Sequence, residues 1–151
     1  MPTKTSPLRI YTSRFGEVAV PPEQLIRFPR GLYGFEAVRR FFLLPHDDDG
    51  LFFWLQAAEE SDLAMLVTNP LMFFPEYELE VSDADADLLE ANSPADLSVF
   101  AILTVHRAAR QVTANLLGPV LINAAARFGL QIELDPDRYT TRRPLPSREA
   151  A

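Results

Sequence analysis

Short apolar runs separated by turn residues constrain the fold of this chain more than any other feature. Most runs are rich in β-branched and aromatic residues, and Gly, Pro, Asn or Asp follows nearly every one, which is typical of β-strands. Strands spaced so closely, with little helix between them, predict an antiparallel barrel or sandwich. The predicted strands are residues 8–12, 17–20, 24–28, 41–44, 51–57, 63–68, 77–81, 97–106, 114–117, 120–124 and 130–134.

Two short helices are predicted between these strands. One covers residues 35–40, and the other covers residues 82–91. Ser82 is a favourable N-cap for the second helix, because its side-chain oxygen can accept a hydrogen bond from an unpaired backbone N–H of the first turn. The aspartates that follow, beginning with Asp83, lie near the positive end of the helix dipole. The expected fold is therefore mainly β, with one or two short helices.

The chain reads as a single domain over residues 1–151, with an ordered core from about 8 to 139 and a tail over 140–151. Its length of 151 residues fits one domain, and no repeat or Gly/Ser linker divides it. There is no cysteine, which excludes disulfides and thiolate metal sites and fits a reducing compartment. No apolar run approaches the roughly 20 residues that a membrane helix needs, and no signal peptide is recognisable. We therefore expect a cytoplasmic protein.

Charge is distributed in three blocks along the sequence. Residues 1–40 carry a net charge of +4, residues 41–106 carry −14, and residues 107–151 carry +3. The middle block holds fourteen Asp and Glu residues and no Lys or Arg. Such a block repels nucleic acid and attracts basic partners. The alternative is a solvated acidic surface that serves only solubility.

Candidate catalytic and metal-binding residues are sparse. His46 lies beside Asp47-Asp48-Asp49, but this run precedes Gly50 between two predicted strands and reads as a turn. The aspartates from Asp83 onward match the start of a calcium-binding loop, yet the positions that need Gly and Glu hold Leu88 and Pro94. No phosphate-binding glycine loop or nucleophile motif is present. We expect no cofactor, no metal and no enzymatic activity, with a carboxylate-dependent hydrolase as the remote alternative.

Large apolar residues between Pro70 and Pro75 form a candidate partner-binding cluster, made of Leu71, Met72, Phe73 and Phe74. Adjacent side chains in extended backbone point to opposite sides, so one phenylalanine is expected to face outward. The flanking prolines limit strand pairing, which keeps side chains accessible. The alternative is that all four residues pack into one end of the barrel. Stacking on nucleic acid is not expected, because no basic residue lies nearby.

Five segments, taken in order, resemble segments of the FliW family of flagellar assembly factors. They are residues 28–36 (FPRGLYGFE), 53–56 (FWLQ), 68–77 (TNPLMFFPEY), 113–123 (TANLLGPVLIN) and 139–145 (YTTRRPL). Tyr33 stands where the family commonly has Pro. Residues 124–129 also depart from the family, which tends to have a more basic turn there.

The resemblance implies a compact, mostly antiparallel β-barrel-like fold and two protein partners. FliW proteins bind flagellin, and they bind CsrA, a small basic RNA-binding protein that represses translation of flagellin mRNA. The resemblance favours an allosteric release of that repression over direct cover of the RNA site. A generic β-barrel module that binds protein but not CsrA is the alternative.

Three glutamates are the predicted contacts for a basic partner. Glu76 directly precedes the predicted strand 77–81, and Glu76, Glu78 and Glu80 alternate with Tyr77, Leu79 and Val81. Alternation places the three carboxylates on one side and the three apolar residues on the other.

Overall fold

The computed structural model describes residues 6–146. The strands are β1 (Leu8–Thr12), β2 (Gly16–Val20), β3 (Ile26–Arg27), β4 (Arg40–Pro45), β5 (Phe52–Ala57), β6 (Ala64–Thr68), β7 (Ser98–His106), β8 (Gln111–Ala114), β9 (Val120–Asn123), β10 (Phe128–Gln131) and β11 (Arg143–Pro144). Helical structure in this part of the chain is limited to α1 (Asp83–Leu88) and the 3-10 turns η1 (Pro22–Gln24), η2 (Pro70–Met72) and η3 (Pro94–Asp96). None of the described helices is long and apolar enough to cross a membrane.

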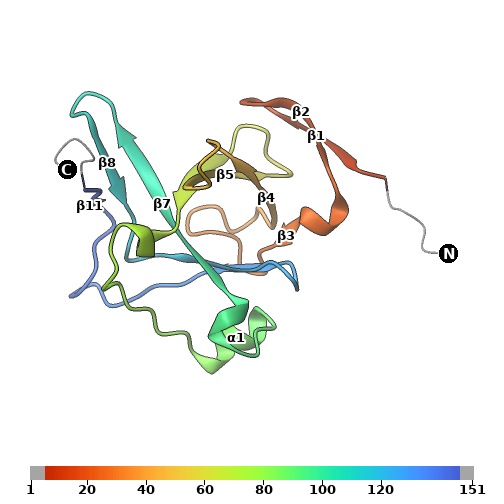
Figure 1. Ribbon diagram of the computed structural model, residues 1–151. Helices are drawn as coiled ribbons and strands as arrows, with labels where there is room; N and C mark the ends of the chain where they lie inside the picture. Colours follow the sequence, from red (N-terminus) through yellow and green to blue (C-terminus); the bar gives the residue numbers. More distant parts are fainter. Residues whose placement is uncertain (1–5, 147–151) are drawn as a thin grey trace.

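A large sheet curls into a ring because β7 pairs with strands on both sides (Figure 1). Its residues Ser98–Phe100 pair with β9, and Ile102 pairs with Val67 of β6. The ring continues through β5, β4, β3 and β10 back to β9, and the β3–β10 pair is its parallel contact. The prediction of a mainly β, antiparallel, barrel-like fold with little helix is confirmed.

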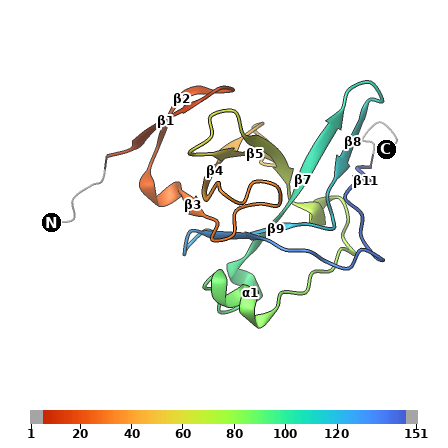
Figure 2. The same cartoon turned by 180° about the vertical axis from the view of Figure 1, so that it is seen from behind.

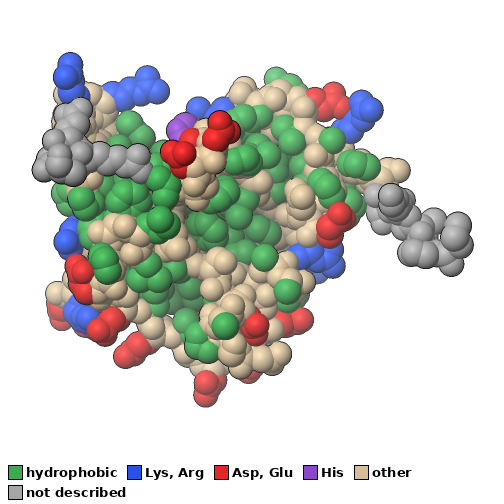
Figure 3. Space-filling model, viewed as in Figure 1, with side chains coloured by type: hydrophobic (Ala, Val, Ile, Leu, Met, Phe, Trp, Pro, Cys, Tyr) green, Lys and Arg blue, Asp and Glu red, His purple; other side chains and the backbone are tan. Residues whose placement is uncertain are grey.

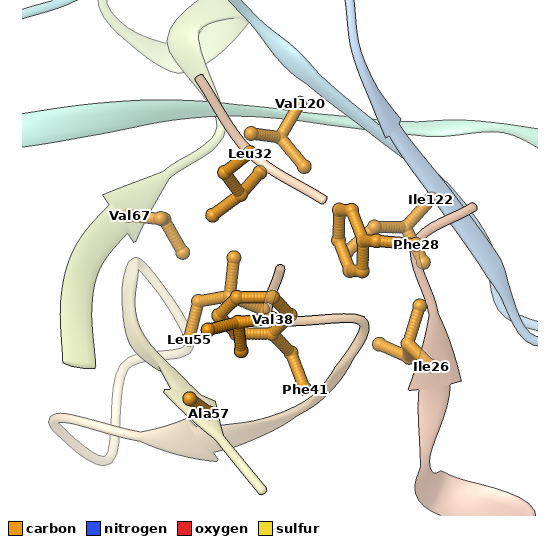
Figure 4. Packing of buried hydrophobic residues seen from close by; sticks show 10 residues of the cluster. All are labelled: Ile26, Phe28, Leu32, Val38, Phe41, Leu55, Ala57, Val67, Val120 and Ile122. Atoms are coloured by element: carbon orange, nitrogen blue, oxygen red, sulfur yellow. The ribbon is translucent and has the colours of Figure 1, made fainter. Parts of the chain in front are cut away.

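Apolar side chains fill the ring (Figure 4). Phe28 and Phe41 are fully buried and meet edge to face with ring centroids 5.1 Å apart. The Phe28 ring lies so close to Gly129 that a Cβ there would overlap it, so this position of β10 requires glycine. The buried residues of this cluster are Ile26, Phe28, Leu32, Val38, Phe41, Leu55, Ala57, Val67, Val120 and Ile122.

A second layer covers the outer face of β9 and β10. Leu89, which follows α1, is fully buried against Leu121 and Leu130. As a result, every residue of β9 is buried. This explains why β9 has a continuous apolar run in place of the alternation expected for a strand with one face in water.

The helix predicted over residues 35–40 is wrong. Gly31 and Gly34 adopt positive φ values of 64° and 87°, and a chain of tight turns follows. Phe35 N donates to Leu32 O at 2.8 Å, and Val38 N donates to Phe35 O at 3.1 Å. The two glycines favour left-handed turn conformations over a helix nucleus, and β4 begins at Arg40.

The strand predicted over residues 77–81 is also wrong, because this stretch pairs with no strand. The predicted strand 24–28 is reduced to β3 after the 3-10 turn η1, and the strand 130–134 becomes β10, which ends at Gln131. A strand extends only as far as a neighbouring strand is there to form hydrogen bonds with it. The apolar pattern of the sequence does not show where that neighbouring strand ends.

Part of the predicted tail belongs to the fold. β11 pairs with β8, and Leu145 N donates a hydrogen bond of 2.9 Å to Val112 O. Leu145 also packs against a third cluster of buried residues, around Phe74 and Tyr77. The tail predicted to start at residue 140 is therefore packed on the β7–β8 hairpin as far as residue 145. Residues 147–151 lie outside the described residues.

Candidate partner-binding surface

The segment that leaves β6 and returns to β7, residues 69–97, holds every residue predicted to contact partners, and we call it the outer segment. It begins with η2, where the Asn69 side chain accepts a hydrogen bond of 3.0 Å from Leu71 N. It then runs extended over the outside of the barrel and forms α1 and η3 before β7 (Figure 2).

Two aromatic side chains hold the first half of the outer segment on the protein. Phe74 and Tyr77 are each only 5% exposed. The Tyr77 hydroxyl donates a 2.5 Å hydrogen bond to Leu116 O, and its ring meets Tyr139 edge to face at 4.9 Å. Burial raises the pKa of Tyr77 above its usual value. The Arg143 guanidinium lies 4.7 Å from the Phe74 ring centroid.

The predicted apolar cluster is therefore divided by the structure. Phe74 is buried, and Phe73 is partly buried against the same cluster, with its ring 6.0 Å from that of Phe52. Leu71 and Met72 face outward, 40% and 59% exposed. The side chains available to a partner are those of η2.

The three predicted glutamates are all exposed. Although no strand forms, the expected alternation holds, since Tyr77 is buried while Leu79 and Val81 are half-buried. Glu78 is the most constrained of the three. Its backbone N–H donates to the Tyr139 hydroxyl at 3.1 Å, and its carboxylate lies 3.7 Å from the Arg138 guanidinium.

The second half of the outer segment is held through α1. Ser82 caps the helix as predicted, accepting a 3.1 Å hydrogen bond from Asp85 N. At the other end, the buried Asn123 side chain donates to Leu89 O at 2.9 Å and to Glu90 O at 3.3 Å. The sequence did not reveal this role of Asn123, which stands in a β-strand distant from α1 along the chain.

An apolar groove of about 410 Å³ runs between α1, η2 and the start of β7. Its lining residues are Leu71, Leu79, Val81, Ala86, Ala91, Asn92, Ser93, Pro94, Leu97, Val99 and Leu121. No Lys or Arg lines it, and Figure 3 shows Asp and Glu side chains around this end of the molecule, over α1. The groove was not predicted. The sequence pattern that could have indicated it is an alternation of apolar and polar residues, at Leu79 and Val81 and again at Leu97 and Val99.

The candidate metal residues do not gather into a site. Among residues 6–146, no group of three His, Cys, Asp or Glu side chains is placed to hold a metal ion. His46 Nδ1 accepts a hydrogen bond of 3.2 Å from Trp54 Nε1. His46 is thus engaged by an aromatic neighbour in β5.

By its fold and this surface, the chain is a small, mainly β protein with an acidic outer segment. A sequence model of the family described as FliW protein matches residues 9–145. The flagellar assembly factor FliW of Moorella thermoacetica is 38% identical over 139 residues, which cover 91% of this chain and 88% of that protein. The flagellar assembly factor FliW of Desulfitobacterium hafniense strain Y51 is 40% identical over 144 residues, covering 95% of each.

A crystal structure of the flagellar assembly factor FliW matches with a TM-score of 0.84 and 29% identity, covering 93% of this chain and 99% of that chain. The chain therefore belongs to the FliW family.

Proposed function

We propose that this protein is a cytoplasmic flagellar assembly factor that binds CsrA and relieves its repression of flagellin translation. We further propose that it binds flagellin as a chaperone-like partner. The observation that carries the proposal is the outer segment, where acidic side chains without any Lys or Arg lie beside an apolar groove. Membership of the FliW family supports the role in flagellar assembly that its members' names give.

CsrA is basic, and the outer segment offers it complementary charge. Glu76, Glu78 and Glu80 are exposed, and α1 follows them directly with Asp83 and Asp87 exposed as well. Charges arranged in this way accelerate encounter with a basic partner and disfavour acidic ones. Their effect weakens as the Debye length falls from about 10 Å at 0.1 M salt to about 3 Å at 1 M.

The test for CsrA is a comparison of two triple variants with equal change in net charge. Glu76→Gln, Glu78→Gln and Glu80→Gln together should slow association with purified CsrA and flatten its dependence on salt. The control variant combines Glu23→Gln, Asp48→Asn and Asp49→Asn, which are exposed acids outside the outer segment. Stopped-flow or surface plasmon resonance measures the rates. Equal slowing by both variants would show only a net-charge effect and remove the proposed contact.

Flagellin is proposed to use the groove. A helix that binds in a groove depends on a few apolar anchors, and Leu71 lines the groove while Met72 is exposed in the same turn. Loss of an anchor contact at the centre of an interface costs roughly 2 kcal/mol or more. Leu71→Ser should therefore weaken flagellin binding about thirtyfold or more with little change in the unfolding midpoint.

Phe74→Ala is the comparison variant in the same experiment, because it is expected to lower stability and not only binding. Because Phe74 is buried, its truncation should cost about 3–5 kcal/mol of stability. Calorimetric titration with flagellin, together with thermal unfolding, distinguishes the two effects. Normal flagellin binding by the folded Leu71→Ser variant would exclude the groove.

A further inference from the structure

Three arginines come together on the side of the barrel where β3, β4 and the β9–β10 turn meet. Arg27 of β3 and Arg40 of β4 lie directly opposite each other in the antiparallel pair. Arg127 ends the β9–β10 turn, and its carbonyl oxygen accepts a hydrogen bond of 2.9 Å from Arg27 N. All three residues are exposed, and Figure 3 shows Lys and Arg side chains gathered beside β3. The fold thus concentrates positive charge at this place.

This positive charge is only partly balanced by the part of the chain that the structure describes. Like charges directly opposite each other in an antiparallel pair destabilise a sheet. Arg40 lies 3.6 Å from the Glu59 carboxylate, whereas neither Arg27 nor Arg127 forms an ion pair with any of residues 6–146. An anion bound between the arginines would remove the repulsion that remains.

Arg127 has a backbone conformation that favours glycine. Its φ is 65°, in the left-handed region that residues with a Cβ rarely adopt. The turn imposes this conformation, since Arg127 N donates a hydrogen bond of 2.7 Å to Asn123 O. Residues held in such conformations at a cost in free energy cluster at binding sites. An arginine at this position therefore indicates a role for its guanidinium.

A hollow of about 430 Å³ lies among the three arginines. Its other lining residues are Pro22, Leu25, Glu90, Ala126 and Phe128. The volume falls in the range of small-molecule sites, about 300–1,000 Å³. Glu90 is the one acid in this lining, so the lining side chains carry three positive charges and one negative charge. The hollow shares no lining residue with the apolar groove of the outer segment.

We propose that this hollow binds a phosphate dianion, either free or as the monoester of a small molecule. A phosphate monoester carries a charge of about −1.5 to −2 at pH 7, which matches the net positive charge of the lining, whereas a single carboxylate would leave one arginine unbalanced. The planar guanidinium groups of Arg27 and Arg127 suit paired hydrogen bonds to phosphate oxygens. Pro22, Leu25 and Phe128 form an apolar wall for the rest of an esterified ligand.

Calorimetric titration of the full chain tests this proposal with three ligands: inorganic phosphate, a nucleoside 5′-monophosphate and the same nucleoside without phosphate. The titrations are made at about pH 7.5, where the monoester is mainly a dianion because its second pKa is about 6. We expect saturable binding of phosphate at one site per chain and no binding of the nucleoside.

The two phosphate-bearing ligands distinguish the two sources of the dianion. Equal or tighter binding of inorganic phosphate would assign the site to free phosphate. Tighter binding of the monophosphate would assign it to a monoester that also contacts the apolar wall. Saturable binding of neither ligand, or equal binding of the nucleoside and its monophosphate, would overturn the proposal.

Two matched glycine variants test whether the arginines make the site. Arg127→Gly should weaken phosphate binding about tenfold or more, because a charged hydrogen-bond donor is lost. It should not lower the unfolding midpoint, because glycine suits the left-handed conformation. The control is Arg110→Gly in the β7–β8 turn, which makes the same change of charge at a φ of 51° outside the hollow. This control should bind phosphate as the wild type does.

Glu90→Gln removes the negative charge from the lining and should tighten phosphate binding. Equal weakening by Arg127→Gly and Arg110→Gly would show only an effect of net charge. That result, or weaker binding by Glu90→Gln, would refute the site.

Discussion

The barrel and the outer segment are two regions of one chain that are held together in different ways. The barrel closes its own sheet, because β7 pairs with both β6 and β9 and leaves the ring without an open edge. The outer segment pairs with no strand, and a few side chains such as Tyr77 and Asn123 fix it to the barrel. Single contacts of the outer segment can therefore be perturbed while the barrel remains folded.

The difference also separates where charge and apolar surface are found. The ring encloses its apolar side chains around Phe28, whereas the outer segment exposes part of its apolar surface in the groove beside its acids. Regions with few buried contacts open at lower free-energy cost than a closed core. We expect the outer segment to open before the barrel unfolds.

The largest effect is expected at the centre of the barrel. Phe28→Ala removes a fully buried ring that contacts Phe41 and covers Gly129, which should cost about 3–5 kcal/mol of unfolding free energy. Urea denaturation measures the loss. The matched control is Phe35→Ala, at an exposed phenylalanine. A loss below about 1 kcal/mol for Phe28→Ala would show that the ring-filling core is not the main source of stability.

A smaller and more local effect is expected at Asn123. Asn123→Ala leaves Leu89 O and Glu90 O without their donor and Ala126 N without its acceptor, at a cost of about 2–3 kcal/mol for unsatisfied buried groups. Hydrogen exchange should accelerate most at α1, with β4 to β6 protected as in the wild type. Uniform acceleration over the whole chain would mean that the outer segment and the barrel open as one unit.

The smallest effect is expected from removal of one hydroxyl. Tyr77→Phe deletes the hydrogen bond to Leu116 O and should cost about 1 kcal/mol at neutral pH. Because burial raises the pKa of Tyr77, the folded state keeps a proton that an unfolded tyrosine loses near pH 10. Wild-type stability should therefore fall as pH rises above about 10, and the difference from Tyr77→Phe should narrow. A constant difference between pH 7 and 11 would contradict this.

Strand positions were the most predictable part of this protein, and closure of the ring was the least. Runs such as 41–44 and 51–57 reappear as β4 and β5, because local β-propensity and turn residues specify hairpins. The β7–β9 pair joins strands that are not consecutive, and no local pattern encodes such a contact.

The candidate surface was predictable in its residues and not in its shape. Alternation correctly predicted that Glu76, Glu78 and Glu80 are exposed, although the backbone there is no strand. The adjacent phenylalanines could not be assigned from sequence, since burial of Phe74 depends on Arg143 and Leu116 from the far end of the chain. The groove needs five separate elements to meet, namely η2, α1, η3, β7 and β9, so only the folded structure reveals it.

The central claim is that the outer segment contacts CsrA while the barrel serves as its scaffold. Hydrogen exchange of the protein with and without saturating CsrA tests this claim most directly. We predict slower exchange in residues 69–97, and unchanged exchange in β4, β5 and the β1–β2 hairpin. Protection centred on β4 and β5, with residues 69–97 exchanging as in the free protein, would contradict it.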